Sequence, residues 1–498
     1  MRWHVRFPRS VMIPAALVVL NACGTVPELV LSPSDESNLI DIRLNFKVGS
    51  AADPENQPGL ARLTLWTIMH GGTKDLTQEE ITYLKYPLAA AENLFIDRDN
   101  LVISATVHGE KFDDYYPLLR DRLLRPRWDK KDFEHQKKQL AATIENSLMG
   151  ENDEWFGKEM LQWLLYPQGH PYHWPTVGRV EAVENLTIKD VEAFWENHLG
   201  TGNLVIGLAG PHTPKQRKQI EKDFSGFHFK SYEPTPLPAP VELSAQAVVL
   251  VEKPTDAAAI SMGFPLDVSP ADPDYYALLL FNACFGQHRT FVGRLMNEMR
   301  VKRGLNYGDY SYINHFVQNS YSPYPRPGVF RRQQYFSIWI RPVKRENAHF
   351  AIRQAIWELN DVVEHGIPEE KFQHAKEFIV HYAKLWAASQ TSQLGFLVDS
   401  HLAGIPYYID QIESMASSLT REQVNAAVQR HLTPENLQIA VICKDAPELA
   451  EALRTNKPSP IHYDNPVSPD ILEKDQEIMN YPLNISGIEI LAYQETFK

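Results

Sequence analysis

The sequence predicts two related domains in tandem, each of which mixes amphipathic helices with strands. The main observation is an internal repeat: residues 186–206 align with residues 419–439 at an offset of 233, with nine identities in twenty-one positions. Shorter matches upstream, at offsets of 239 and 214, extend the repeat towards the start of each copy. These offsets indicate a duplicated unit of about 200 residues, which is an ordinary domain size.

A proline-rich run separates the two copies. Residues 233–240 read Glu-Pro-Thr-Pro-Leu-Pro-Ala-Pro, and alternating prolines favour an extended, semi-rigid linker. The drift between the offsets predicts about 25 extra residues in the second copy, which we assign to the loop-rich stretch 314–332. The predicted parts are a signal peptide (1–22), a lipidated tether (23–37), an N-terminal domain (38–232), a linker (233–245), a C-terminal domain (246–460) and an extended C-terminal tail (461–498).

The hydrophobic patterns predict individual elements. Residues 40–48 and 101–107 are expected to be strands, and residues 134–146 and 347–365 carry long helical patterns. In both copies of the repeat a threonine, Thr187 or Thr420, is expected to cap a helix that leads through a turn to an apolar strand. Gly304 is expected to end another helix, and residues 305–312 to begin a strand.

The composition excludes several classes of protein. The 498 residues include 49 basic and 62 acidic side chains, a net charge of -13, with 44% apolar residues. These values are close to a globular average, which excludes global disorder. An acidic chain without a dense basic run lacks the charge that nucleic-acid binding needs. The only long uncharged apolar run, residues 11–20, is too short to span a membrane, so a polytopic membrane protein is also excluded.

The N-terminus has the pattern of an export signal. Three arginines, Arg2, Arg6 and Arg9, precede the apolar run. Residues 20–23, Leu-Asn-Ala-Cys, resemble a bacterial lipobox, which implies that Cys23 is acylated and becomes the mature N-terminus. Because glycine rather than aspartate follows Cys23, the lipoprotein pattern implies an outer-membrane location facing the periplasm. The alternative is an ordinary signal peptide that ends near a cysteine.

The other two cysteines, Cys284 and Cys443, lie in apolar runs. An exported location permits a disulfide, but buried free thiols are the favoured interpretation. His170 and His173 are interpreted as structural, because Pro171 argues against a regular helix that would place both on one face.

Several segments resemble the M16 zinc peptidase family, the pitrilysin/insulinase and mitochondrial-processing-peptidase-like class. The resemblance covers residues 38–475 and implies duplicated α+β domains of the LuxS/MPP-like type, forming half of a clamshell. The segments that carry it are residues 46–50, 58–62, 71–73, 165–172, 293–296 and 300–307.

The chain departs from the family at the metal site. The family places His-x-x-Glu-His directly after Gly-Leu-Ala, because two histidines four residues apart share one helix face and hold zinc. Here these positions are Arg62, Leu65 and Trp66, and the more distant ligand position falls at Thr143, although Glu145 leaves that alignment open. None of the residues at the motif ligates zinc, so no cofactor is expected in this chain.

A second part of the family's site is retained. The family carries an arginine and a tyrosine seven residues apart, which stabilise the substrate carbonyl as it becomes an oxyanion. Arg300 and Tyr307 have this spacing. The alternative interpretation is a surface helix residue and a half-buried strand residue.

The resemblance implies a non-zinc subunit that is inactive alone. Its expected partner is an M16 homologue that has an intact motif and holds zinc, and the pair would cleave unstructured peptides bound as an added strand. The alternatives are a catalytically inert peptide-binding or scaffold lipoprotein, and an autonomous enzyme of another mechanism.

Overall fold

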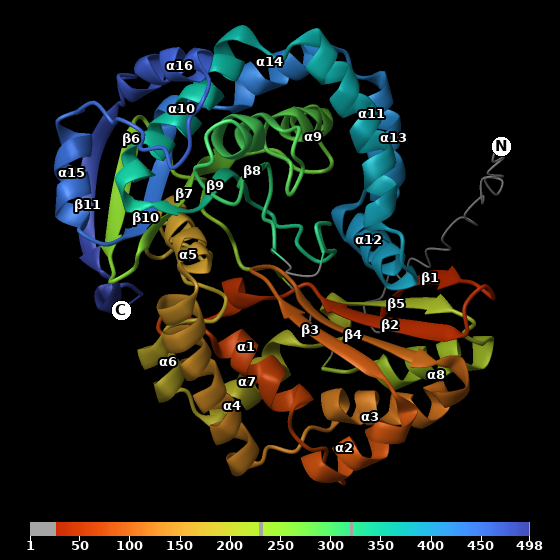
Figure 1. The fold of residues 1–498 in the computed structure, drawn as a ribbon. Coiled ribbons are helices and arrows are strands. Elements are labelled where there is room, and N and C mark those ends of the chain that lie inside the picture. The colour runs from red at the N-terminus through yellow and green to blue at the C-terminus, as the bar shows by residue number, and fades with distance from the viewer. Residues whose placement is uncertain (1–25, 229–232, 319–321, 498) are drawn as a thin grey trace.

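The computed structural model describes residues 26–228, 233–318 and 322–497. Cys23 and the predicted signal lie outside these residues. Within them, no helix combines the length and apolar character needed to cross a membrane. The described chain folds into two halves, each with one sheet and helices around it (Figure 1).

The first half holds a five-stranded sheet in the order β1-β5-β2-β4-β3. β1 and β5 are parallel, and the other neighbours are antiparallel. Its strands are β1 (Glu28–Pro33), β2 (Leu39–Phe46), β3 (Ala91–Ile96), β4 (Leu101–His108) and β5 (Leu204–Gly210). Its helices are α1 (Leu60–Met69), α2 (Gln78–Lys85), α3 (Phe112–Leu124), α4 (Lys130–Ala142), α5 (Asp153–Leu165), α6 (Val180–Asn185), α7 (Ile188–His198) and α8 (Pro214–Phe224).

The second half holds a six-stranded sheet in the order β11-β6-β10-β7-β9-β8. Its strands are β6 (Gln246–Glu252), β7 (Ala257–Leu266), β8 (Asp309–Tyr312), β9 (Gln334–Lys344), β10 (Gln438–Cys443) and β11 (Ile485–Ala492). Its helices are α9 (Pro273–Phe285), α10 (Ala348–His365), α11 (Glu369–Trp386), α12 (Gln390–Ala403), α13 (Tyr408–Ser418), α14 (Arg421–His431), α15 (Ala446–Arg454) and α16 (Pro469–Met479).

The two sheets have the same topology, which confirms the internal repeat. The strand that follows the repeated helix is central in both: β5 pairs parallel with β1 and antiparallel with β2, and β10 pairs parallel with β6 and antiparallel with β7. The repeated helices, α7 and α14, begin after Thr187 and Thr420, each in a reciprocal capping box. β11 is an additional edge strand of the second sheet.

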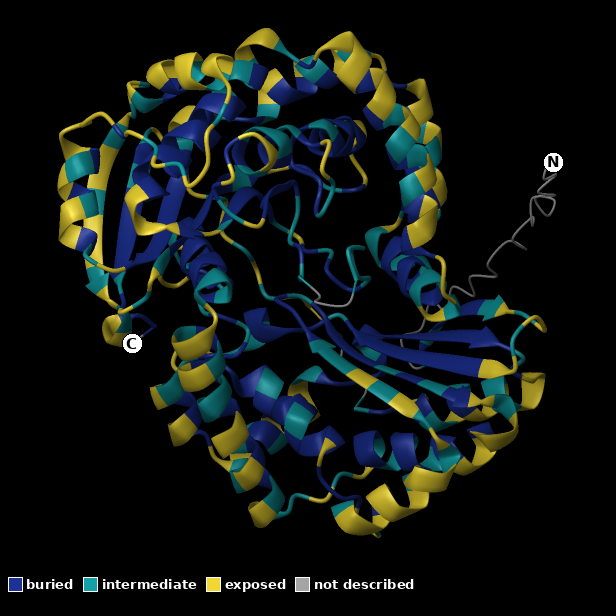
Figure 2. Ribbon diagram, viewed as in Figure 1, coloured by how far each residue is buried: buried dark blue, intermediate teal, exposed yellow. Residues whose placement is uncertain are grey.

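One helix from each half packs on the sheet of the other half. α5 packs on β7 and β10 of the second sheet, and α12 packs on β5, β1 and β2 of the first. Glycines permit both approaches: a Cβ on Gly207 of β5 would lie 2.9 Å from Val398, and a Cβ on Gly157 of α5 would lie 3.4 Å from Ser261. The sheet faces between the halves are therefore buried, while exposed residues concentrate on the outer helices (Figure 2).

The structure differs from the sequence-based predictions in three places. Residues 28–33, assigned to the tether, form β1, because their apolar side chains extend the first sheet beside β5. The tail is not extended throughout, since it contains helix α16, whose Ile478 is buried. The strand predicted over 305–312 begins only at Asp309, because residues before it form a turn.

Other predictions are confirmed. The strands expected at 40–48 and 101–107 are β2 and β4, and the helix expected at 347–365 is α10. The helix expected at 134–146 is α4, which ends at Ala142 and continues as a π-helix, η4 (Thr143–Glu151). Cys284 and Cys443 are free thiols.

Candidate functional site

Helix α1 carries the positions of the lost zinc motif. The Asp53 carboxylate fixes its first turn by accepting hydrogen bonds from the backbone N–H groups of Gly59 and Ala61, each at 2.8 Å. Gly59 has a φ of +103°, which favours glycine at this helix start. Burial raises the pKa of Asp53 to about 7. The motif positions thus lie on a regular helix. The zinc site is lost because of the residue types at these positions, not because of the backbone geometry.

The three motif residues have different surroundings. Arg62 is half-buried and donates two hydrogen bonds to Thr176, from Nε to the carbonyl oxygen at 3.2 Å and from Nη2 to Oγ1 at 3.1 Å. Leu65 is 1% exposed and belongs to the core of the first half. The Trp66 ring centre lies 5.9 Å from the Arg62 guanidinium carbon. An arginine, a leucine and a tryptophan offer no ligand for zinc, so these residues do not fit the family's metal.

The more distant ligand position does not restore a site. Thr143 begins the π-helix η4, and its hydroxyl donates to the backbone carbonyl of Gln139 at 2.8 Å. The neighbouring Glu145 is exposed. Within residues 26–228, 233–318 and 322–497, no three His, Cys, Asp or Glu side chains gather as a metal site would require.

The structure brings Arg300 and Tyr307 together at the surface. Arg300 lies on the π-helix η6 (Met296–Val301), and its Nη1 donates to the backbone carbonyl of Tyr307 at 2.7 Å. The guanidinium carbon lies 5.7 Å from the Tyr307 ring centre and 5.1 Å from the Phe291 ring centre. The Tyr307 side chain is 75% exposed. The exposed phenol and the half-buried cation beside it therefore form one pair at the surface.

A short turn holds Tyr307 in this position. Gly304 ends the helix with a φ of +65°, and its N–H donates to the Arg300 carbonyl at 2.8 Å. The Asn306 side chain accepts from the backbone N–H of Gly308 at 3.0 Å and donates to the buried Asp309 at 2.7 Å. This asparagine-centred turn precedes β8, which is why Tyr307 is an exposed turn residue.

A cavity of about 470 Å³ lies between the two halves. Arg62 of α1, Lys158 of α5 and Trp339 of β9 line it, so residues from both halves contribute. Neither Arg300 nor Tyr307 lines it. Within one chain, the positions of the lost zinc motif and the retained pair therefore do not share this cavity.

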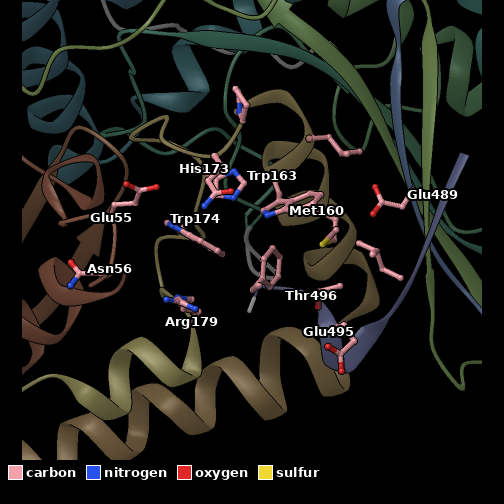
Figure 3. Close-up of a pocket in the computed structure, with 15 residues that line it drawn as sticks. Glu55, Asn56, Met160, Trp163, His173, Trp174, Arg179, Glu489, Glu495 and Thr496 are labelled. Atoms are coloured by element: carbon pink, nitrogen blue, oxygen red, sulfur yellow. The ribbon is translucent and has the colours of Figure 1, made fainter. Parts of the chain in front are cut away.

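A more open cavity of about 940 Å³ lies beside α5 and the end of the chain (Figure 3). Trp163 and Trp174 form part of its wall, with His173 between them. The His173 Nδ1 lies 2.6 Å from the Tyr166 carbonyl, and His170 Nε2 lies 3.1 Å from the Gln333 side chain. Burial lowers the pKa of both histidines. Hydrogen bonds thus hold both rings, while His173 also lines this cavity, and their structural role stays a prediction.

The family follows from comparison with known proteins. Residues 29–156 match the model of the insulinase family, peptidase family M16, and residues 185–379 match the model described as the peptidase M16 inactive domain. The chain belongs to the M16 peptidase family. The M16 character of both halves agrees with the repeated α+β fold.

Two curated M16 relatives are similar in sequence. One is an uncharacterized zinc protease of Streptomyces coelicolor, 23% identical over 264 residues, which are 51% of this chain and 53% of that protein. The other is the β subunit of the mitochondrial-processing peptidase of Caenorhabditis elegans, 22% identical over 205 residues, 41% of this chain and 43% of that protein. The chain spans about half the length of the curated relatives that it matches.

Several solved structures share the fold. A peptidase M16 inactive domain from Pseudomonas fluorescens has a TM-score of 0.75 at 23% identity, covering 86% of this chain and 98% of that chain. A protease from Helicobacter pylori has a TM-score of 0.72 at 16% identity, covering 86% and 99%. The periplasmic protease PqqL from Escherichia coli has a TM-score of 0.66 at 14% identity, covering 89% of this chain and 49% of that chain.

Proposed function

We propose that this protein is the non-zinc-binding subunit of a periplasmic M16-type metallopeptidase. In this role it supplies Arg300 and Tyr307 to a partner that carries an intact His-x-x-Glu-His motif, holds zinc and cleaves unstructured peptides. The observation that carries the proposal is the contrast between the two family positions: α1 has no metal ligand, whereas Arg300 lies beside Tyr307 at the surface and the Tyr307 side chain is exposed. A surface pair of this kind suits a site completed by another subunit.

The chemistry of the pair fits charge stabilisation. In peptide hydrolysis the carbonyl oxygen gains negative charge in the transition state, and fixed donors at that point lower the barrier. Arg300 is a permanent cation, and its bond to the Tyr307 backbone fixes the geometry of the pair while leaving the phenol exposed. The family name of one matched region, an inactive domain, supports a subunit that is not catalytic alone.

The proposed location is the outer membrane, facing the periplasm, through acylated Cys23. The support is the lipobox-like sequence at residues 20–23 and the glycine that follows. Two or three acyl chains on one residue anchor firmly, since each buried CH2 contributes about 0.8 kcal/mol.

The first prediction concerns the pair. We expect a co-purified complex with a zinc-motif homologue from the same genome to cleave a fluorogenic unstructured peptide. Arg300→Ala or Tyr307→Phe should lower kcat by about 10- to 1000-fold, because each removes one transition-state donor. Tyr83→Phe is the matched control, since Tyr83 is also an exposed tyrosine, at 81%, and lies on the distant helix α2.

Size-exclusion chromatography of each variant complex separates a loss of chemistry from a loss of assembly. Unchanged kcat in both variants, with the complex intact, would contradict the catalytic role and leave a scaffold role. Proteolysis by the purified single chain that chelators abolish would contradict the proposal as a whole.

A further inference from the structure

The cavity between the halves contains more positive charge than its carboxylates neutralise. Its lining includes four cations, Arg62, Lys158, Arg331 and Arg341, and three carboxylates, Asp97, Glu154 and Glu159. Each carboxylate already has a cationic partner: Asp97 pairs with Arg331 at 2.5 Å, Glu154 with Lys158 at 2.7 Å and with Arg341 at 3.2 Å, and Glu159 with the buried Arg98 at 3.4 Å. The cation left over is Arg62.

Arg62 has unused donor capacity. A guanidinium carries five N–H donors, and its two hydrogen bonds both go to Thr176, a neutral residue. Among the described residues, no carboxylate forms an ion pair with it. Burial lowers the pKa of Arg62 to about 10, so the side chain is charged at neutral pH. The charges of Glu159, Asp97 and Asp53 stabilise this cation, but its remaining N–H donors are left for an anionic ligand.

Trp339 contributes aromatic surface to the same cavity. Trp339 is 2% exposed, and its indole Nε1 has no acceptor in the part of the chain that the structure describes. The Lys158 ammonium lies 3.7 Å from the Trp339 ring centre, which adds positive charge beside the indole. This N–H is closed off from the cavity, so the residue contributes its ring to the wall and no donor to a ligand.

The other residues that line the cavity indicate what kind of ligand it holds. Phe95, Trp155, Phe316 and Tyr335 supply aromatic surface. The volume of about 470 Å³ falls in the range of sites that hold small ligands. A planar guanidinium binds a carboxylate through two parallel hydrogen bonds, which a neutral amide cannot match.

We propose that this cavity binds the C-terminal carboxylate of a short peptide, with Arg62 as its donor. An arginine at the position of a zinc ligand would thus give the cleft a fixed cation that recognises a carboxylate. The site lies within one chain, so the test of this proposal does not depend on the proposed partnership at Arg300 and Tyr307.

The test uses the full chain and one peptide in two forms, acetyl-Ala-Ala-Leu as the free acid and as the carboxamide. Calorimetry and tryptophan fluorescence report binding, because Trp155 and Trp339 line the cavity. We expect the acid to bind with a Kd in the micromolar to millimolar range and the amide to bind at least about 10-fold more weakly. Acetate distinguishes a peptide site from a general anion site, and we expect it to compete only weakly.

Single substitutions test which side chain donates hydrogen bonds to the peptide carboxylate. Arg62→Gln should weaken binding of the acid by about 10- to 100-fold and leave the amide unchanged, whereas Arg62→Lys should recover part of the affinity. Trp339→Phe keeps an aromatic ring and removes an N–H that the cavity does not reach, so it should leave the affinity for the acid nearly unchanged. Arg454→Gln, at an exposed arginine of α15, is the matched control.

Equal affinity for acid and amide, or no saturable binding of the acid at millimolar concentration, would overturn the proposal. Acetate that binds as tightly as the peptide acid would overturn the peptide assignment. This comparison on the unaltered chain remains decisive even if a variant fails to fold, which circular dichroism detects.

Discussion

Asp309 is buried beneath the turn that presents Tyr307, and it has no cationic partner among the ion pairs of the described chain. Its Oδ1 accepts from Asn306, while its Oδ2 is buried without a hydrogen bond. Burial raises the pKa of this carboxyl from 3.8 to about 7. Between pH 4 and 7 the native state therefore retains a proton that the unfolded state releases, so the free energy of unfolding falls as the pH rises.

Asp309→Asn should remove this dependence, because an amide carries no charge to bury. We expect the variant to be about 1–3 kcal/mol more stable than the wild type at pH 8 and close to it at pH 4.5. Urea unfolding at the two pH values measures this. Asp464→Asn, at an exposed carboxylate, is the control. A destabilised Asp309→Asn variant at pH 8 would contradict the assignment.

The resemblance to the family predicted that Arg300 and Tyr307 lie together, but not how exposed the tyrosine is. A strand from residue 305 would have half-buried the tyrosine. The turn at Asn306 depends on a side-chain hydrogen bond to Asp309, and sequence periodicity does not report such a bond. The same limit applies to Trp339, whose unsatisfied N–H becomes visible only once both halves close around it.

At the scale of elements, the repeat predicted the positions of helices and strands. It did not predict that α5 packs on the second sheet and α12 on the first. The Thr187 and Thr420 caps and the strands after them follow from local pattern. The packing of α5 on the second sheet and of α12 on the first joins residues more than a hundred positions apart. An apolar helix face has the same sequence pattern whichever sheet covers it.

Gly207 of β5 lies where α12 packs on the first sheet. A Cβ there would lie 2.9 Å from Val398 and 3.0 Å from Leu394 of α12, closer than side-chain contacts allow. We expect Gly207→Ala to lower the free energy of unfolding by about 1–3 kcal/mol, because α12 must shift from the sheet. Gly487→Ala is the matched control: Gly487 is also a strand glycine, and a Cβ there meets no atom within 4 Å. Equal midpoints in chemical denaturation would contradict tight packing at Gly207.

At the scale of the whole molecule, the connection between β8 and β9 joins the two halves. The sequence placed extra residues at 314–332, and the equivalent connection in the first half, between β3 and β4, is the short turn 97–100. Side chains at the end of the longer connection bind that turn: Arg331 pairs with Asp97, and Arg332 with Asp99. The sequence predicted the location of the insertion, but not that Arg331 and Arg332 at its end pair with the other half.

The two adjacent arginines offer an internal comparison of buried and exposed ion pairs between the halves. The side chains of Arg331 and Asp97 are 1% and 2% exposed, and two hydrogen bonds at 2.8 Å and 2.5 Å join them. The Arg332 side chain is 36% exposed and that of Asp99 is 11% exposed, so this pair is the more solvated of the two, with Arg332 Nη2 at 2.8 Å from Asp99. Removing one member of a buried pair leaves an uncompensated charge and costs about 3–5 kcal/mol, whereas an exposed pair contributes at most about 1 kcal/mol.

We therefore expect Arg331→Ala to lower the free energy of unfolding by about 3–5 kcal/mol and Arg332→Ala by less than about 1 kcal/mol, measured by urea denaturation of the full chain. Because α5 and α12 also join the halves, the wild type should unfold in one transition that both halves share. If Arg331→Ala instead splits unfolding into two transitions, this ion pair, rather than the exchanged helices, couples the halves. Equal effects of the two substitutions would show that burial of the Arg331–Asp97 pair contributes nothing to the joining of the halves.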